Sequence, residues 1–581
     1  MLFPRAALLP CRLLLATLLL SCLCGASIAA DVEPAETVLL GGKIVTLDAK
    51  ETVAEAIAVR DGKIVAVGDD DDVRKLIGDK TTVVQLDGKT VVPGFIETHC
   101  HAIGVAWAEM EQPYVELTSI AEIQDWLRRR AREVPPGRWI RVPRTDVTRI
   151  RERRHPTPAE LDAACSTHPV WLNAARKNVL NTLGIERAEI DDKTETLGGG
   201  EILRDAEGRV RMIAGGDAYL RGLLPRREFT LDETLEGLQR VHVLYNRLGI
   251  TSIFERAANR EGYDTYQELR RRGKLTVRTN ATIRQQFKSG DDVEKFSKQL
   301  GLKTGDGDDW IRVGPLKITV DGGIHWGNTY LREPYGERRA KFYVHDDPNF
   351  RGQRNYTVDQ MADIFAAGHR LGWQLSCHVT GDAGVDAVLD AVERVAEETT
   401  IEENRFALIH AYFPAADAVD RARRLGMCVD TQGYLYYKDS DAIHDVYGRE
   451  WAERFIGVGD WVKEGVPVAV NSDHMSGLDP DRAMNAFNPM LQLYVLVTRK
   501  NEAGRVYGER QKLSRIDALR CLTSSAAYLS FDEEKKGTLE TGKLADLAVL
   551  DRDYLTCDAD AIRRIGVVLT MVDGRIVHWR K

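Results

Sequence analysis

The sequence predicts an α/β protein built on a TIM-like (β/α)8 barrel, with a small composite β-sandwich and a lobe inserted after the first barrel strand. Three observations predict this fold. Eight strand-like apolar runs alternate with helical stretches through the middle of the chain, and β-rich segments with matching turns flank them at both ends. The interval after the first of the eight runs is far longer than an ordinary loop, which predicts the inserted lobe.

The first thirty residues have the composition of a secretory signal peptide. Residues 1–30 contain no acidic residue, carry Arg5 and Arg12, and end in small residues after an apolar stretch. We expect this segment to be removed and the chain to be exported, to the periplasm or outside the cell. The stretch is shorter than the ~20 residues that a spanning helix needs, so no stable membrane span is expected. Lipoprotein attachment at Cys22 is the minority alternative, because the residues before it resemble a lipoprotein cleavage box.

The charge and the cysteine content exclude several classes of partner and of fold. A formal net charge of -8 is modest for 581 residues, and basic and acidic residues are interspersed. Neither nucleic acid nor an anionic membrane is therefore indicated as a partner, whereas a small-molecule substrate is. The cysteines after residue 30 are widely spaced and form no CxxC pair, which is not a disulfide framework. Cys100 and Cys377 stand beside candidate metal ligands, but neighbours in a strand point to opposite faces, so we expect both in the core.

Residues 31–92 are interpreted as short alternating strands separated by turns. The Asp-Gly-Lys triplets at Asp61 and Asp87 predict hairpins. Residues 530–581 repeat this style in GTLETGKLADLAVLDRD and VVLTMVDGRIVHWR. Because two distant segments share the same turns, we expect one β-sandwich built from both termini.

Residues 93–529 contain the alternation that predicts the barrel. The intervals between the apolar runs have helical spacing, as in TVDQMADIFAAGHRLG. The interval from about 105 to 227 is assigned to the inserted lobe, which would cover the mouth of the barrel. The eight predicted strands are GFIETH, GITSIFE, LTVRTNATI, IRVGPLKITV, WQLSCH, RFALIH, MCVDTQ and VPVAVNS.

Five of these runs carry, at or near their carboxyl ends, residues that can hold a divalent metal. Side chains at the carboxyl ends of parallel barrel strands meet at one mouth, where they can build a site together. Each histidine alone is more often a packed core residue, and a lone His-x-His pair is a weak signal. The ordered set is stronger: His99, His101, Lys317, His378, His410 and Asp473.

The residue types also predict roles. His99 and His101 lie two apart, so both rings share one face of a strand and can reach one cation at about 2.0–2.1 Å. Asp473 follows the eighth run, beside the first strand in a closed barrel, where it can bind the metal and accept a proton from water. The alternative is a structural role, in which Asp473 caps the amino terminus of a helix and binds no metal. Lys317 is the exception, because an ammonium repels a cation; it helps only if it is neutral or converted to a carbamate that bridges two ions.

Seven motifs carry a resemblance to a known family: PGFIETHCH, GITSIFE, LKITVDG, CHVTGDAGVD, LIHAY, NSDHMSGLDP and GTLETGKLADLAVLDRD. They extend over nearly the whole chain after residue 30. On these motifs the sequence resembles the amidohydrolase superfamily, in particular the branch called amidohydrolase family three, and is similar to N-substituted formamide deformylases.

The resemblance implies a metal-dependent hydrolase barrel that binds one or two divalent ions, usually zinc. By this comparison Lys317 would be a carboxylated bridging ligand and Asp473 the ligand that moves the proton. The implied ligands are all present: His99, His101, His378, His410, Lys317 and Asp473.

Two segments depart from the family pattern. The family often has Asp-Gly-His in the lobe, where this chain has Ala175-Arg176-Lys177, and Gln-Pro-x-His after the seventh strand, where it has Gln432-Gly433-Tyr434-Leu435. The substrate specificity of this chain therefore cannot be deduced from that of the family. Arg176 or Lys177 would meet an anionic group, unless it is merely a surface cation. The candidate substrate contacts are Asp321, His325, Arg176, Gln432, Tyr434 and His474.

We therefore predict a hydrolase that uses a metal-activated water to cleave a non-peptide C–N bond in an amide, N-acyl or formamide substrate. The same ligands would serve a lactone, a dipeptide-like or imide substrate, or a deamination. A catalytically inactive binding protein with the same fold is the alternative from another class, but it should have lost ligands. A regulatory role in exoenzyme production has no support in the residues, which include no DNA-binding motif. The oligomeric state is left open, a homo-oligomer included.

Overall fold

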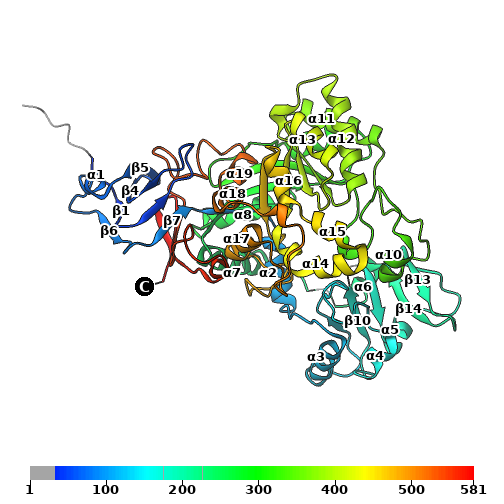
Figure 1. The fold of residues 1–581 in the computed structure, drawn as a ribbon. Coiled ribbons are helices and arrows are strands. Elements are labelled where there is room, and N and C mark those ends of the chain that lie inside the picture. Colours follow the sequence, from blue (N-terminus) through cyan, green and yellow to red (C-terminus); the bar gives the residue numbers. More distant parts are fainter. Residues whose placement is uncertain (1–32, 175, 226, 581) are drawn as a thin grey trace, which may run out of the picture.

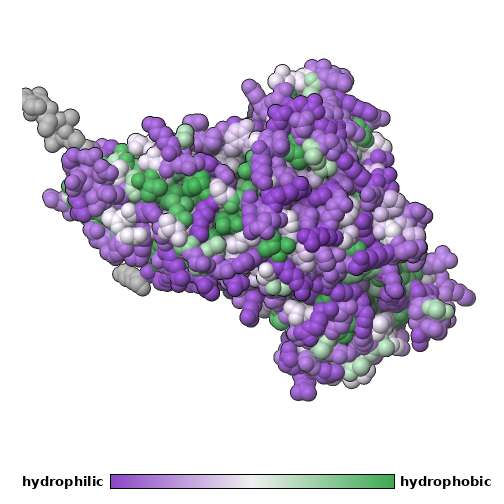
Figure 2. Space-filling view, viewed as in Figure 1, coloured by the Kyte–Doolittle hydropathy of each residue, from purple (hydrophilic) through white to green (hydrophobic). Residues whose placement is uncertain are grey.

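The computed structural model describes residues 33–174, 176–225 and 227–580. The predicted signal peptide and Cys22 lie outside the described residues. A barrel forms the centre of the molecule, with the β-sandwich at one end and the lobe at the other (Figure 1). Polar residues predominate on the face shown in Figure 2, and a hydrophobic area lies over the sandwich and its junction with the barrel.

Eight parallel strands form the barrel, and each one matches a predicted run. Neighbouring strands pair in chain order. The first and last strands meet where Cys100 pairs with His474, and the His101 amide donates to the His474 carbonyl at 3.0 Å. The predicted barrel is thus confirmed. Its strands are β8 (Phe95–Cys100), β15 (Ile250–Ala258), β16 (Arg278–Arg284), β17 (Ile311–Thr319), β18 (Leu375–Val379), β19 (Ala407–His410), β20 (Cys428–Gln432) and β21 (Val468–Asn471).

Helices cover the outside of the barrel, so its strands are buried on both faces and are continuous apolar runs. In α11 (Val358–Arg370) the buried side chains Met361, Ile364 and Phe365 recur at helical spacing, and Thr357 caps the helix in a capping box. The other larger helices between the strands are α2 (Ala102–Glu111), α7 (Leu231–Arg247), α8 (Arg260–Arg271), α9 (Gly290–Leu300), α10 (Gly336–Tyr343), α12 (Asp382–Ala396), α13 (Ala416–Arg424) and α14 (Gly433–Tyr447).

Shorter elements complete the barrel layer. They are α15 (Arg449–Arg454), α16 (Val458–Lys463), α17 (Pro489–Thr498), α18 (Arg515–Cys521) and α19 (Ser524–Tyr528). The 3-10 turns are η1 (Ile324–Trp326), η2 (Glu402–Asn404), η3 (Glu509–Gln511) and η4 (Ala559–Arg564). Of these, η1 contributes wall residues to the cavity described below.

The lobe is a separate layer of sheet and helices between β8 and β15. Its six strands are ordered β12-β13-β14-β11-β10-β9, and Ile123, Leu127, Val142 and Leu172 belong to a core of its own. Helix α2 precedes it and packs on α7, where Gly237 lies against Ala106. The elements are α3 (Ile120–Glu133), β9 (Ile140–Val142), α4 (Pro158–Asp162), β10 (Val170–Ala174), β11 (Lys177–Leu180), α5 (Thr182–Arg187), β12 (Thr196–Leu197), β13 (Gly200–Arg204), β14 (Val210–Ala214) and α6 (Asp217–Gly222).

Both termini build the β-sandwich, as predicted. One sheet is ordered β5-β4-β1-β6, and the other, β24-β23-β22-β7-β2-β3, joins N-terminal to C-terminal strands. Leu39, Ile57, Val91, Leu547 and Leu569 share the core between them. The elements are β1 (Thr37–Leu40), β2 (Lys43–Val45), β3 (Val53–Ala54), β4 (Ala56–Arg60), β5 (Lys63–Gly68), α1 (Asp70–Arg74), β6 (Thr82–Gln85), β7 (Thr90–Pro93), β22 (Leu547–Leu550), β23 (Val567–Val572) and β24 (Arg575–Trp579).

Only one of the two predicted DGK hairpins forms. Asp61 (φ 50°) and Gly62 (φ 72°) join β4 to β5, which pair as neighbours. Asp87 (φ 51°) and Gly88 (φ 78°) take the same left-handed conformations, but β6 and β7 belong to different sheets. The hairpin predicted at Asp87 is wrong: its turn crosses between the layers of the sandwich, because turn residues specify local backbone and not the partner of the next strand.

The cysteines behave as the sequence predicts. Cys100 and Cys377 are fully buried, and the six cysteines of the described residues are all free. No helix in the described part of the chain has the length and apolar character needed to cross a membrane.

Candidate metal centre

All the predicted metal-ligand residues lie together at the carboxyl ends of the barrel strands. They line one cavity of about 130 Å³, which we call the metal cavity. His99 lies within β8, Lys317 within β17, His378 within β18 and His410 at the end of β19. The barrel thus brings together residues that are separated by more than 370 positions in the chain. The wall residues in question are His99, His101, Lys317, His378, His410 and Asp473.

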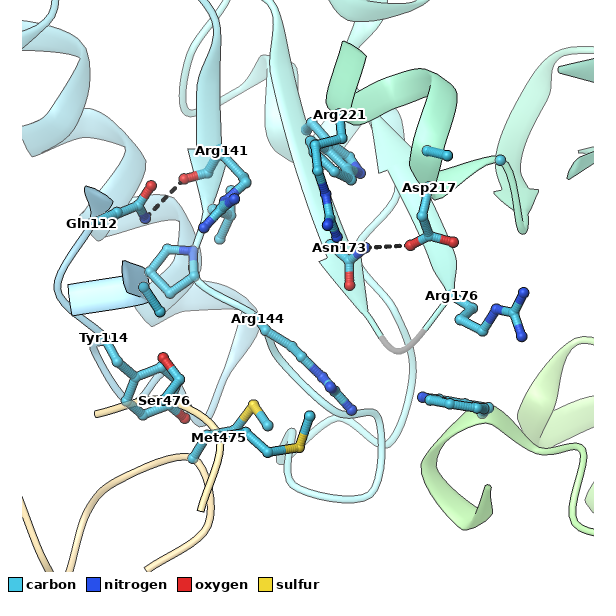
Figure 3. Close-up of a pocket in the computed structure, with 18 of the residues that line it drawn as sticks. Gln112, Tyr114, Arg141, Arg144, Asn173, Arg176, Asp217, Arg221, Met475 and Ser476 are labelled. Atoms are coloured by element: carbon cyan, nitrogen blue, oxygen red, sulfur yellow. Dashed lines mark hydrogen bonds between the residues drawn. The ribbon is translucent and has the colours of Figure 1, made fainter. Parts of the chain in front are cut away.

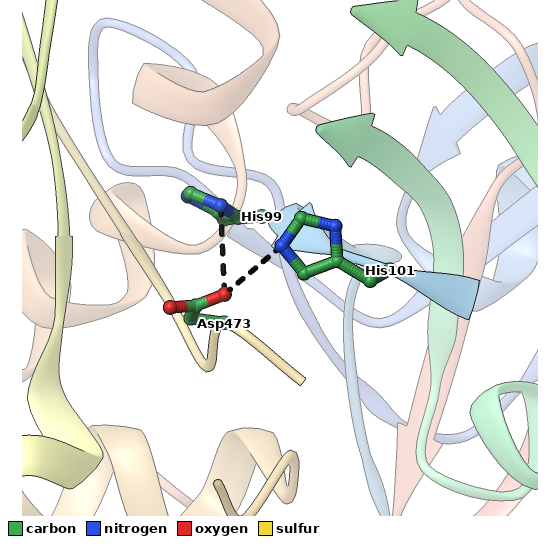
Figure 4. Close-up of side chains that lie close together, drawn as sticks. All are labelled: His99, His101 and Asp473. Atoms are coloured by element: carbon green, nitrogen blue, oxygen red, sulfur yellow. Dashed lines mark ion pairs between the residues drawn. The ribbon is translucent and has the colours of Figure 1, made fainter. Parts of the chain in front are cut away.

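Three of these side chains face one another at ligand spacing (Figure 4). Asp473 Oδ1 lies 3.5 Å from His99 Nε2 and 3.3 Å from His101 Nε2. Ligand atoms about 2.0–2.1 Å from a tetrahedral zinc ion lie about 3.3–3.4 Å apart, so the spacing fits a common cation. Asp473 Oδ1 is buried without a hydrogen-bond partner among the described residues, as a metal-ligand atom would be. Two imidazoles and a carboxylate suit a divalent ion such as zinc.

His378 and His410 form the other side of the metal cavity, with ring centroids 4.3 Å apart. His378 Nε2 lies 2.7 Å from the Gly322 carbonyl oxygen, and His410 Nδ1 lies 2.7 Å from Gln432 Oε1. Because both partners only accept hydrogen bonds, these nitrogens carry the ring protons. The opposite nitrogen of each ring is then left with a free lone pair, which is the form that binds a metal.

Burial keeps the imidazoles neutral. It lowers the pKa of His378 to about 4, and it holds the pKa of His99 and of His410 well below the usual range. All three are therefore unprotonated at neutral pH, which a metal ligand must be.

Lys317 has the environment that a reactive lysine needs. Its side chain is buried, with Nζ 3.3 Å from His99 Nε2. Burial, assisted by the Arg256 guanidinium, lowers the pKa of Lys317 to about 7. A large fraction of the amine is therefore neutral at pH 7, and only the neutral form can react with carbon dioxide.

Two left-handed residues turn the chain at the site. His410 has φ 84° and Asp473 has φ 54°, although neither is a glycine. Such conformations cost about 1–3 kcal/mol and persist where the surrounding structure holds them. Asn485 Nδ2 donates to the Asp473 carbonyl at 2.8 Å, and Thr431 Oγ1 donates to the His410 carbonyl at 2.7 Å. Side chains of neighbouring elements thus hold both ligands in place.

Carboxylates below the ligands fix the strand ends, and the sequence reasoning missed them. Glu97 accepts from the His99 amide at 3.1 Å and from the Ser472 amide at 3.0 Å, which ties β8 to β21. Asp430 pairs with the buried Arg256. The available signal was a charged residue inside an apolar run, in GFIETH and in MCVDTQ, because a buried charge needs a partner.

A family model with the description "Amidohydrolase family" matches residues 82–578. The chain belongs to the amidohydrolase family. The resemblance inferred from the sequence motifs is thereby confirmed. An N-substituted formamide deformylase of Arthrobacter pascens is 27% identical over 562 residues, which cover 94% of this chain and 98% of the relative.

Solved structures share the fold of this amidohydrolase. An uncharacterized metal-dependent hydrolase from Pyrococcus horikoshii OT3 superposes with a TM-score of 0.66 at 22% identity, covering 90% of this chain and 99% of the other. An adenosine deaminase from Xanthomonas campestris with bound zinc superposes with a TM-score of 0.52 at 12% identity, covering 94% of each chain. At these identities the likeness concerns the fold alone.

Two of the candidate substrate contacts lie where a substrate would reach them. His325 lines the metal cavity and contacts Asp439 Oδ2 through Nε2 at 3.0 Å. Arg176 lies farther out, where its guanidinium packs over the Trp326 ring at 5.4 Å. Lys177, its neighbour, is buried.

The other four candidates are buried side chains that do not line the metal cavity. Gln432 Oε1 holds the His410 ring, and Gln432 Nε2 donates to Asn471 Oδ1 at 2.9 Å. His474 Nδ1 lies 2.9 Å from the Tyr245 hydroxyl. Asp321 accepts from two backbone amides at 2.8 Å each, and Tyr434 packs beneath Arg149. In this amidohydrolase the polar groups of Gln432, His474 and Asp321 are occupied by protein partners, and none of the four side chains lines the metal cavity.

The wall of the metal cavity includes residues that the sequence reasoning did not select. Arg144 comes from the lobe, Arg284 ends β16, and Tyr412 follows β19. The strand-end rule that found the metal ligands would have found Arg284 and Tyr412 as well. Arg144 has no comparable signal, because it lies in an irregular segment of the lobe.

Proposed function

We propose that this amidohydrolase cleaves a non-peptide C–N bond, in an amide, N-acyl or formamide substrate, by adding water at a zinc centre. The observation that carries the proposal is the spacing of Asp473 Oδ1, 3.5 Å and 3.3 Å from the Nε2 atoms of His99 and His101. Asp473 Oδ1 accepts no hydrogen bond among the described residues, so it is available to a cation or a proton. The name of the Arthrobacter relative supports an N-formyl or similar bond.

His99, His101 and Asp473 would hold one ion, and His378 and His410 would contribute to a second. A divalent ion supplies Lewis acidity, which makes water more acidic and withdraws electrons from the scissile carbonyl. Side chains of the protein carry out the proton transfers. Asp473 accepts a proton from the attacking water while the water oxygen bonds to the carbonyl carbon. The same carboxyl then gives the proton to the nitrogen as the C–N bond breaks, which leaves a carboxylic acid and an amine.

We further propose that Lys317 is carboxylated. The neutral amine adds to carbon dioxide and loses a proton, which yields a carbamate with two oxygens. The lowered pKa, about 7, provides the neutral amine at physiological pH. The carbamate would place its charge beside His99, because Lys317 Nζ lies 3.3 Å from His99 Nε2. Its oxygens could then bridge two ions.

The test combines metal analysis of the purified protein with a hydrolysis screen of N-formyl, N-acyl, lactone and dipeptide substrates. We expect at least one zinc ion per chain and turnover of an amide. His378→Ala should lose metal and activity, whereas His444→Ala, a partly buried position of α14 outside the metal cavity, is the matched control. Protein without metal, or a His378→Ala variant that retains full turnover, would contradict the proposal.

Export is a separate proposal. Residues 1–30 have the charge and hydropathy pattern of a signal peptide. Sequencing the amino terminus of protein from each cell fraction tests it: we expect an exported chain that begins near residue 30, and a cytoplasmic chain that keeps Met1 would refute it.

A further inference from the structure

A larger hollow opens outward from the metal cavity, between the lobe and the barrel. Its volume is about 810 Å³, and we call it the vestibule. It shares wall residues with the metal cavity, so the two are continuous and a substrate could extend through both. The shared residues are Arg144, Arg284, Trp326, Met475 and Met484.

Arginines dominate the charge of the vestibule. Five arginines and one acidic residue, Asp217, line it, which gives a formal charge of 5 − 1 = +4 on its wall. The whole chain, by contrast, carries -8. Figure 3 shows several of these side chains gathered around the hollow from different lobe elements. The arginines are Arg141 in β9, Arg144 after it, Arg176 before β11, Arg221 in α6 and Arg284 at the end of β16.

Only some of this charge is compensated by the protein. Arg141 pairs with Glu111 at 3.3 Å, and Arg144 pairs with Asp146 at 3.2 Å. Asp217 is engaged by Asn173, whose Nδ2 donates to it at 2.6 Å (Figure 3).

Arg176, Arg221 and Arg284 have no ion-pair partner in the described residues, and all three are exposed. The guanidinium of Arg176 lies over the Trp326 ring, which positions it while its N–H groups remain available to a ligand.

The rest of the wall combines apolar and small residues with the polar side chains of Gln112, Asn173 and Ser476. Met475 and Met484 line the passage from the metal cavity, and Trp171 and Tyr114 lie farther out. Gly216, with φ 71°, lies so close to the Leu197 carbonyl that a Cβ would be 2.6 Å from that oxygen, so this wall must stay without a side chain. The methionines of the passage therefore suit an apolar stem, and Arg176 and Arg221, which lie outside the metal cavity, suit an anion beyond it.

We propose that the vestibule binds a carboxylate or phosphate group of the substrate, remote from the bond that is cleaved. The substrate is then an acylated amine with an apolar stem and an anionic end. Arg176 and Arg221 determine this specificity, because both come from the lobe and neither has an ion-pair partner in the part of the chain that the structure describes. The identification of the substrate class rests on the proposed amide hydrolysis, whereas binding of an anion in the vestibule does not.

The decisive experiment compares three acylated hexylamines that share the acyl group preferred in the screen. One has a neutral methyl end, one ends in a carboxylate and one ends in a phosphate. We expect kcat/KM for an anionic substrate to exceed that for the neutral one by at least about tenfold, mainly through KM, as one charge-assisted hydrogen bond would produce. The better of the two anions identifies the natural end group.

The double variant R176Q/R221Q should raise KM for the anionic substrate about tenfold or more and should affect the neutral substrate much less. R187Q replaces an exposed lobe arginine outside the vestibule and serves as the matched control, with no change expected for either substrate. Equal kcat/KM for neutral and anionic substrates in the wild type would overturn the inference and leave the proposed function standing.

A second readout does not need turnover. Hexanoate, hexyl phosphate and hexanol are titrated calorimetrically into wild-type protein and into R176Q/R221Q. If no amide is hydrolysed but an anionic probe binds the wild type more tightly than the variant, the proposed function fails and anion binding stands. If neither anionic probe binds more tightly than hexanol, the vestibule inference fails.

Discussion

The metal cavity and the vestibule adjoin each other, but different parts of the chain build them. Every ligand of the metal cavity comes from a barrel strand or the residues after it. His99, Lys317 and His410 are buried, and hydrogen bonds to Gly322 and Gln432 hold the rings of His378 and His410. The vestibule takes four of its five arginines from the lobe, and three of the five have no ion-pair partner among the described residues. The metal ligands thus lie on the barrel, whereas most of the arginines that would recognise an anionic group lie on the inserted lobe. The sequence of the lobe can vary without changing the barrel.

The largest effect is expected from Asp473→Asn. The amide keeps the shape of the carboxylate but cannot take the water's proton, so kcat should fall by about 10²–10⁴-fold. Hexanoate or hexyl phosphate should still bind the vestibule in this variant, as measured by calorimetry. If Asp473→Asn abolished anion binding along with turnover, the separation between the two regions would be wrong.

The next effect concerns the pH dependence of stability in metal-free protein. The pKa of His378 is lowered to about 4 by burial, from its usual value of 6.5, so the unfolded state binds the proton first as pH falls. Stability is therefore complete above pH 6.5 and declines as pH falls from 6.5 to about 4. His378 alone should account for about 3 kcal/mol of this loss.

Denaturant titrations between pH 7 and pH 4 would measure this decline. His378→Asn should flatten it, whereas His444→Asn, where the side chain is 40% exposed, should not. A slope that is identical in His378→Asn and in the wild type would show that the metal cavity does not hold this histidine neutral.

Gln432→Leu tests whether a buried polar neighbour positions a ligand. The change removes the acceptor 2.7 Å from His410 Nδ1, so the ring loses its preferred tautomer. Metal affinity should drop about 10–100-fold, with kcat at saturating metal less affected. Competition with a chelator measures the affinity. Unaltered affinity would mean that Gln432 has no part in the metal cavity.

The smallest effect is expected from salt. At 0.1 M ionic strength, salt screens the electrostatic interactions of exposed arginines over a distance of about 10 Å. Raising the salt concentration should therefore weaken the preference for an anionic substrate severalfold, while turnover of the neutral substrate changes little. A preference that is independent of salt would place the anion contact in the buried metal cavity instead.

Much of the fold could be predicted from local pattern. Barrel strands are covered on both faces, so each one is a continuous apolar run that ends in polar residues. The sandwich halves carry paired turns such as Asp61-Gly62. The Asp87 turn has the same residues and the same left-handed backbone, yet it joins different sheets. Its strands find partners far away in the chain, which no local pattern encodes.

The candidate site was predictable to a similar degree. Strand-end position located the metal ligands, and the same rule would have added Arg284. Sequence position could not show that Gln432 and His474 turn inward to protein partners, because the direction of a side chain depends on the strands beside it. Glu97 and Asp430 were visible only as charges inside apolar runs.

The chain alone therefore specified the eight barrel strands, the two-ended sandwich and the residue types of the metal cavity, because these follow from short-range periodicity and from where strands end. Tertiary structure decided which ring nitrogens carry protons, how Asp473 reaches both His99 in β8 and His101 just after it, and how the arginines of the lobe converge on one hollow. Those properties depend on contacts between segments that are tens to hundreds of residues apart. They arise only when the barrel closes between β8 and β21 and the lobe packs over its mouth.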